Sequence, residues 1–297
     1  MRFDPSINAA VTSDIQQSEQ NLQTAFQQVS TGLRVNQPSD NPSASAAYIQ
    51  LQAEQANVDQ YTTNAGSALS QAQLSDQVVT QVVALLNQAV TLGTEGANST
   101  SSATDRDSIA TNIQGILTNV VGLANTTFQG VSLFGGTVSG TAAFTADSSS
   151  PTGYTYNGNN TVNQISVGES LTVQANIPGS TLFTNSSGSV LGALSSLATA
   201  LQSGTSAQIG TATTAITTAL NYVTSQHAVF GNAINQLNSQ ETYLSQETVT
   251  LSSRATSLVG IDAATAAENL TQAETENSSV LAAAAKVIQN TLLTYLQ

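Results

Sequence analysis

Apolar residues recur at alternating steps of four and three along much of the chain. This spacing is typical of a helix that packs lengthwise along a coiled-coil seam. The longest run lies in residues 205–258, which contain no proline and predict one long helix. Its seam positions are Ile216, Leu220, Val223, His227, Phe230, Ile234, Leu237, Glu241, Leu244, Thr248, Leu251, Ala255 and Leu258.

Two further helices follow the same spacing earlier in the chain. Residues 43–92 predict the first, and residues 105–125 predict the second, with Asp105 in its first turn at the positive end of the helix dipole. Their seam positions are Tyr61, Ala65, Ala68, Ala72, Ser75, Val79, Val82, Leu86 and Ala89, then Ile109, Ile113, Ile116 and Val120.

Both ends of the chain also carry an apolar stripe at helical spacing. The stripes predict two amphipathic terminal helices, which have only each other to pack against within one chain. We therefore expect them to be loose in a single copy and to become ordered when copies assemble. The stripe residues are Ile15, Leu22, Phe26, Val29 and Leu33 at one end, and Leu270, Leu281, Ala284, Ile288, Leu292 and Tyr295 at the other.

A short polar turn with two prolines interrupts the first helix and predicts a hinge. Asn36 suits the left-handed position after a helix that spans residues 1–35. Pro38 disfavours helix at the residue before it. Asn41 suits the N-cap of the next helix and Pro42 its first position.

The middle of the chain has no helical period. Residues 129–189 contain short β-prone runs separated by Gly, Asn, Pro and Ser, so they predict a small β-rich insert. Asn157-Gly158 resembles a hairpin turn, and the alternation around Gly168 predicts a second hairpin.

These elements predict a mainly α fold with a β insert, in which both chain ends form a long antiparallel helical bundle. We expect a terminal coiled-coil domain from residues 1–42 and 258–297. A long-helix core domain follows from residues 43–135 and 190–257, and a β-rich outer domain from residues 136–189.

Composition narrows the possible functions. The net charge of −13, with only 5 Lys and Arg in 297 residues, argues against nucleic acid as a partner. The chain has no cysteine and one histidine, His227, which we expect to be a packed or hydrogen-bonded residue of the seam. No catalytic or metal-binding residues, no cofactor, no membrane-spanning helix and no cleaved secretory signal are predicted.

The segment "VSTGLRVNQPSDNPSASAAY" at residues 29–48 resembles the amino-terminal signature of the bacterial flagellin superfamily. Its proline-flanked turn is more similar to the hook–filament junction branch, also called the L-type hook-associated branch, than to filament flagellins. The phrases "FQGVSLFGGT" at 128–137 and "YNGNNTVNQISVGESLTVQANIPGSTLF" at 156–183, and the ending "NTLLTYLQ", are similar to that branch as well. Asn41 departs from the signature, which has Asp there.

The resemblance implies a structural subunit that is not an enzyme. About eleven copies would form a ring between hook and filament of a flagellum, outside the cell. The implied partners are a second hook-associated protein on the hook side, flagellin on the filament side, and an export chaperone on the carboxy-terminal helix. The implied export route is the flagellar type III pathway, which cleaves no signal peptide.

The resemblance also implies that the terminal stripes are contact surfaces between subunits. Arg34 either lies in solvent at a helix end or pairs with an acidic group of a neighbouring subunit, and Asp40 is a candidate partner. The predicted interface residues are Ile15, Leu22, Phe26, Val29, Leu33, Arg34, Asp40, Leu281, Ile288 and Leu292.

Three alternatives remain open at this point. A filament flagellin would share the terminal helices but would polymerise in thousands of copies. An adhesin on a helical stalk would bind glycans through residues 136–189. An enzyme in the β insert would need two carboxylates at a cleft, and no sequence feature places them there.

Overall fold

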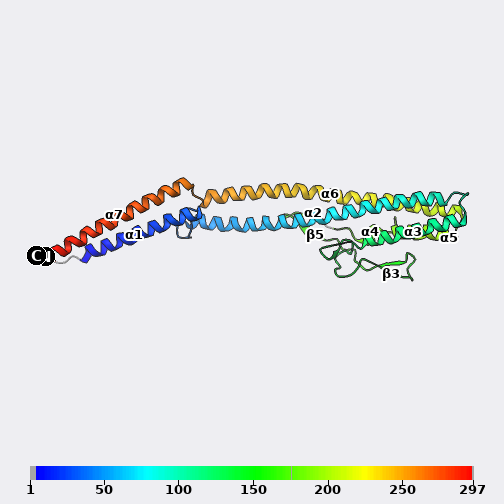
Figure 1. The fold of residues 1–297 in the computed structure, drawn as a ribbon, viewed down its shortest axis with the longest axis horizontal. Helices are drawn as coiled ribbons and strands as arrows, with labels where there is room; N and C mark the ends of the chain where they lie inside the picture. Colours follow the sequence, from blue (N-terminus) through cyan, green and yellow to red (C-terminus); the bar gives the residue numbers. More distant parts are fainter. Residues whose placement is uncertain (1–4, 175, 296–297) are drawn as a thin grey trace. The chain divides into compact units, whose positions relative to one another are not determined.

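The computed structural model describes residues 5–174 and 176–295 of the chain, with side chains described between residues 9 and 287 apart from residue 175. The described elements are mostly helices (Figure 1). The helices are α1 (Pro5–Thr31), α2 (Pro42–Gly96), α3 (Ala103–Ala124), α4 (Gly179–Phe183), α5 (Val190–Ser203), α6 (Ser206–Val259) and α7 (Ala263–Tyr295). The strands are β1 (Thr127–Phe128), β2 (Val131–Ser132), β3 (Phe144–Ala146), β4 (Tyr154–Tyr156), β5 (Gln164–Ser166) and β6 (Thr172–Gln174).

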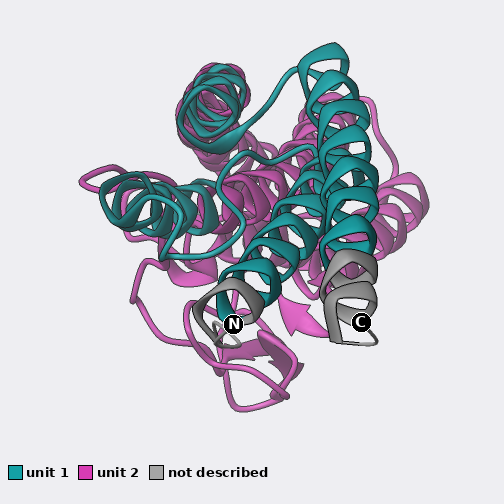
Figure 2. Cartoon of the chain, turned by 90° about the vertical axis from the view of Figure 1, so that its left-hand side faces the viewer, with its two compact units in different colours: residues 1–58, 246–297 teal, residues 59–245 magenta. Residues whose placement is uncertain are grey.

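The chain divides into two compact units (Figure 2). Unit 1 consists of residues 1–58 and 246–297, and unit 2 consists of residues 59–245. The predicted fold class, a mainly α chain with a β insert and long helices from both ends, is confirmed. The division into three domains stays a prediction.

The main hydrophobic core lies in unit 2. Buried residues of α2, α3, α5 and α6 form one continuous cluster there, and aromatic residues of the β insert join it. The predicted seam positions account for much of this core, because the four-three spacing keeps one face of each helix turned inward. Buried seam residues are Ala65, Ala68, Ala72, Ser75, Val79, Val82, Leu86 and Ala89 on α2, Ile109, Ile113, Ile116 and Val120 on α3, and Ile216, Val223, Phe230, Leu237 and Leu244 on α6.

Helix α3 is capped at both ends. Ser102 and Asp105 form a capping box, in which the Asp105 backbone N–H donates to Ser102 Oγ and the Ser102 backbone N–H donates to the Asp105 carboxylate. The side-chain hydrogen bond from Ser102 lowers the pKa of Asp105 below its usual value. At the other end, the Asn125 side chain donates to Phe144 O and accepts from Phe144 N, each at 2.8 Å, which ties β3 to the end of α3.

The β insert consists of antiparallel hairpins. Strand β1 pairs with β2, β3 with β4, and β5 with β6. The predicted hairpin around Gly168 is confirmed, because β5 and β6 flank residues 167–171. The predicted turn at Asn157-Gly158 is wrong. The Asn157 backbone N–H donates to Ala143 O and continues the pairing of β4 with β3, so the chain does not reverse there.

The residues of the segment "GVSLFGGT" at 130–137 have specific packing and backbone roles. Leu133 and Phe134 are fully buried, and the Phe134 ring stands edge-on to Phe183 at a centroid distance of 5.3 Å. Gly136 has a positive φ of 72°, and a Cβ atom at this position would collide with Asn159. Only glycine satisfies both requirements, since other residues are strained at such φ values.

None of the described helices is long and apolar enough to cross a lipid bilayer.

Substitution of Gly136 tests the close approach of the backbone to Asn159. Gly136→Ala should lower the free energy of unfolding by about 3 kcal/mol, because backbone strain and a steric clash act together. Gly140→Ala is the matched control, since Gly140 has a similar φ of 82° and open space around it. It should cost only about 1 kcal/mol. Urea unfolding of both variants measures the difference, and equal losses would contradict the clash.

Candidate subunit interface

The turn between α1 and α2 begins earlier than the sequence predicted. Helix α1 ends at Thr31, and Gly32 adopts the left-handed conformation with φ 69°. The prediction of a helix to residue 35 with Asn36 in the left-handed position is therefore wrong. Glycine takes this conformation without steric cost, so Gly32 ends the helix before Asn36 is reached. Asn36 instead donates from its side chain to Leu33 O.

The residues after α1 pair with the residues before α7. The Arg34 backbone N–H donates to Val259 O at 2.6 Å, and the Ile261 N–H donates to Gly32 O at 3.0 Å. Leu33 and Gly260 face each other in an antiparallel bridge. Val35, Ala44 and Val259 are buried beside this pairing, with Leu33, Tyr48 and Leu258 packed around them.

The rest of the turn is fixed by side chains that bind backbone N–H groups. Asp40 Oδ2 accepts from the N–H groups of Asn36 and Gln37. Asn41 Oδ1 accepts from the Ala44 N–H at 3.0 Å, and α2 begins at Pro42, so the predicted N-cap and first helical residue are confirmed. Pro38 is exposed within the turn. The role of Asn36, Pro38, Asn41 and Pro42 as a hinge stays a prediction.

Arg34 binds the end of α6 rather than the end of its own helix. Its Nη2 atom donates to Leu258 O at 3.1 Å, one residue before α6 ends. A cation at this place interacts favourably with the negative end of the helix dipole. Among the described residues no ion pair joins Arg34 to Asp40. Pairing of Arg34 with a neighbouring subunit stays a prediction.

Helices α1 and α7 pack against each other through small side chains. The buried positions are Ser18 and Ala25 on α1, and Ala266, Ala273 and Ala284 on α7. The Ser18 hydroxyl donates to Asn277 Oδ1 at 3.0 Å across the pair. These residues continue the four-three spacing, and the sequence predicted Ala284 as part of the stripe. It missed Ser18, Ala25, Ala266 and Ala273, because the other stripe positions were chosen among large apolar residues.

The large apolar residues predicted for the interface divide into two groups. Ile15 and Leu22 are half-buried on the face of α1 that carries Ser18 and Ala25, and Leu33 is half-buried beside Val35. The exposed group is Phe26, Val29 and Leu281, with 64%, 44% and 49% of the residue surface accessible to solvent. Ile288 and Leu292 lie in α7 but outside the residues whose side chains are described.

This arrangement leaves the α1–α7 pair partly apolar on its outside, and looseness of the pair in a single copy stays a prediction. An alanine contributes one methyl group, or about 0.8 kcal/mol on burial, whereas a leucine or phenylalanine contributes about 1.5–3 kcal/mol. The pair thus buries its small residues and exposes Phe26, Val29 and Leu281 to water. Phe26 and Val29 are one turn apart on α1, and exposed apolar side chains that lie together are typical of a protein–protein contact surface.

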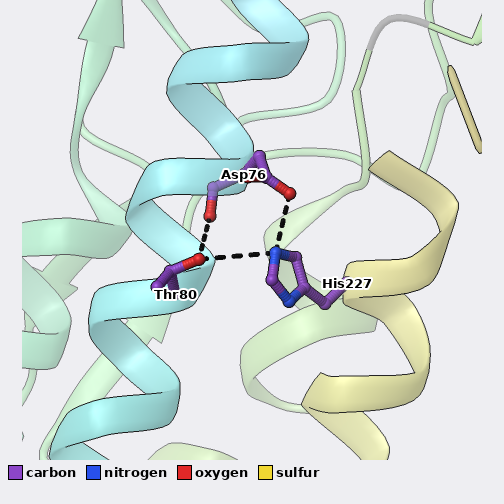
Figure 3. A network of polar contacts seen from close by, with 3 residues as sticks. All are labelled: Asp76, Thr80 and His227. Atoms are coloured by element: carbon purple, nitrogen blue, oxygen red, sulfur yellow. Dashed lines mark hydrogen bonds and ion pairs between the residues drawn. The ribbon is translucent and has the colours of Figure 1, made fainter. Parts of the chain in front are cut away.

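The single histidine takes part in a polar contact in unit 2 (Figure 3). His227 Nε2 of α6 lies 2.7 Å from Asp76 Oδ1 of α2 and 3.4 Å from Thr80 Oγ1. The prediction of a hydrogen-bonded seam residue is confirmed. Asp76 and Thr80 contact the same ring nitrogen, so the hydroxyl and the carboxylate do not lie on opposite sides of the imidazole as in a nucleophile–histidine–carboxylate triad. The described residues contain no cluster of metal-binding side chains. The contact therefore joins two helices and provides no catalytic arrangement.

Two family models match the chain. The bacterial flagellin N-terminal helical region matches residues 6–139, and the bacterial flagellin C-terminal helical region matches residues 213–296. Together these ranges cover well over half of the 297 residues. The chain belongs to the bacterial flagellin family. The superfamily resemblance read from residues 29–48 is thus confirmed.

Curated relatives of this flagellin-family protein include Flagellin B from two strains of Helicobacter pylori. Each is 28% identical over 124 residues, which is 41% of this chain and 24% of the relative. The match therefore spans about a quarter of the length of those relatives.

Solved structures share the fold of this flagellin-family protein over most of its length. A flagellar hook-associated protein from Vibrio parahaemolyticus has a TM-score of 0.66 at 21% identity, covering 74% of this chain and 99% of its own. FlgL from Bacillus cereus has a TM-score of 0.60 at 22% identity, covering 70% and 99%. The flagellar junction protein FlgL from Legionella pneumophila has a TM-score of 0.58 at 17% identity, covering 72% and 99%.

Enlarging a small seam residue tests how α1 and α7 pack. Ala273→Leu should weaken the pair by about 1–3 kcal/mol, because the larger side chain forces the helices apart. Ala267→Leu is the control on the same helix, since Ala267 is exposed, and should change stability by less than about 0.5 kcal/mol. Amide hydrogen exchange within residues 9–31 and 263–287 reports the effect. Unchanged exchange in Ala273→Leu would show that the pair does not depend on the small seam.

Proposed function

We propose that this chain is a structural subunit of the bacterial flagellum, located where the hook joins the filament. The observation that carries the proposal is the α1–α7 pair, which buries Ala25 and Ala273 and leaves Phe26, Val29 and Leu281 exposed. Such a pair gains its remaining burial when it packs against other subunits. Family membership supplies the flagellar setting.

The position at the junction is supported by the compared structures. The three hook-associated or FlgL proteins are covered over 99% of their chains, so this chain contains the equivalent of nearly all their elements. The β insert is small, with strands of two or three residues. A chain of this organisation fits a connector better than a filament subunit with large outer domains.

A role at the junction implies how copies of the chain would assemble. About eleven copies would form a ring through the terminal helices, consistent with the closed symmetry of most homo-oligomers. The ring would contact a second hook-associated protein on one side and flagellin on the other. An export chaperone would hold the carboxy-terminal helix before passage through the flagellar type III route, and no signal peptide would be cleaved. The protein would act outside the cell and needs no cofactor or enzymatic activity.

A filament flagellin is the second candidate, because the curated relatives are flagellins. It would use the same terminal helices for contacts between copies. The two candidates differ in where the protein lies along the flagellum and in how many copies are present.

Immunogold labelling of intact flagella, with antibody raised against residues 136–189, distinguishes the candidates. We expect label at one spot between hook and filament. Label along the whole filament would identify a filament flagellin and contradict the junction role. Flagella without any label would contradict both candidates and favour an adhesin carried on a helical stalk.

Removal of the terminal helices tests their part in assembly. A chain trimmed to residues 41–259 keeps the unit 2 core intact and should melt within a few degrees of the full chain, because that core has its own buried cluster. It should no longer join flagella. Unfolding of the trimmed chain, followed by circular dichroism, would show that α1 and α7 belong to the core of the single copy.

A further inference from the structure

A groove lies between α2 and α6 within unit 1, apart from the α1–α7 pair. Its volume is about 360 Å³, its floor includes Tyr48, Leu51 and Leu251, and Gln52 and Ser252 line it from the two helices. The side chains that line the groove are all uncharged, and a groove that runs between two helices suits a helical partner.

Two exposed apolar side chains flank this groove. Ile49 follows Tyr48 on α2 and is 62% exposed, and Val249 follows Thr248 on α6 and is 68% exposed. Ile49 lies three residues before Gln52, and Val249 lies three residues before Ser252, so each is about 60° of helical rotation from a residue that lines the groove. Each edge of the groove therefore carries one apolar side chain, and both side chains are exposed to solvent.

The charged residues of the same helical segments lie on the opposite side. Glu54 and Arg254 each come two residues after a groove-lining residue, Gln52 and Ser252, which is about 200° of rotation. Glu247 is likewise turned away from Ser252, by about 140°. The groove side carries serine, threonine, alanine and glutamine beside Ile49 and Val249, so it is uncharged.

The charge of the whole chain favours a second copy as the occupant. Each copy carries a net charge of −13, so copies repel one another over most of their surface. An uncharged face with exposed apolar residues is where another copy approaches at the least electrostatic cost. Glu54 and Glu247, which a basic partner would bind, lie on the other side.

We propose that this groove receives α1 of a neighbouring copy, with the neighbour's Phe26 and Val29 placed between Ile49 and Val249. The inference rests on the proposed function and specifies one of the contacts that the assembly would use. Phe26 and Val29 are exposed apolar residues on a helix, and the groove is a different surface of the same unit. Contact between two different surfaces is heterologous, and it propagates around a ring, whereas contact of the groove with itself would stop at a dimer.

Cysteine crosslinking in assembled flagella tests this contact directly, because the natural chain has no cysteine. Flagella are isolated from cells that produce the double variant Phe26→Cys/Val249→Cys and are treated with a short thiol crosslinker. Each copy then offers one thiol to each of two neighbours, so we expect a ladder of crosslinked multimers. The matched control Phe26→Cys/Arg254→Cys places the second thiol on the opposite side of α6 and should remain monomeric.

The outcomes separate this inference from the proposed function. Immunogold labelling of the same flagella shows whether the protein is at the junction. A labelled junction without a ladder, or with a ladder from the control as well, overturns the groove contact and leaves the junction role standing. Dimers from Val249→Cys alone would show that the groove packs against itself, which also overturns the inference. Absence of label overturns the proposed function and the inference together.

An added charge on the groove side gives a second measurement. Ile49→Glu should lower the amount of protein incorporated into flagella by about tenfold, which corresponds to about 1.4 kcal/mol of lost contact energy. Gln50→Glu adds the same charge one residue later, on the side away from the groove, and should change incorporation by less than about twofold. Both positions are exposed, so the folded single copy should tolerate both changes. Equal incorporation of the two variants would overturn the proposal.

Discussion

The pairing of residues 32–34 with residues 259–261 is the constraint on which unit 1 depends. It joins the end of α1 to the start of α7 by backbone hydrogen bonds and a β-bridge, although the two segments are more than two hundred residues apart in the chain. Because backbone atoms make these bonds, they depend on the conformation of Gly32 more than on the identity of neighbouring side chains. The small cluster of Val35, Ala44 and Val259 then shields the pairing from water.

Each terminal helix has a buried face of small residues and an outer face with large apolar residues. Small residues let α1 and α7 approach closely but bury little area, so we expect their contact to be weak in a single copy. The large residues on the outside would aggregate if the surface were extensive, but Gln, Asn, Ser and Thr make up more than half of α1 and about a third of α7. This composition keeps the helices soluble while adding few of the charges that would repel other copies.

Sequence patterns predicted the long helices well and the chain reversals poorly. The seams of α2 and α6 were readable because large apolar residues and alanines alternate over many turns, which leaves few other ways to bury them. The end of α1 was misplaced because Gly32 and Asn36 both suit a left-handed position, and only tertiary pairing selects between them. Asn157-Gly158 failed as a turn because Asn157 bonds to Ala143, a partner that local sequence does not reveal. The exposure of Phe26, as against the burial of Ala25, depends on where α7 lies and could not be read from one stripe.

The Asn125 side chain binds both the N–H and the C=O of Phe144, so β3 is anchored at the end of α3 through a single amide. The far end of that hairpin, residues 147–153, is held by its own turn hydrogen bonds and by one exposed bond from the Ser195 hydroxyl of α5 to Pro151 O. Extra sequence inserted at this turn would leave the anchoring amide and the buried aromatic rings untouched. The hairpin is therefore a natural place for the chain to gain or lose length during evolution, and for an epitope or tag to be displayed without altering the helical core.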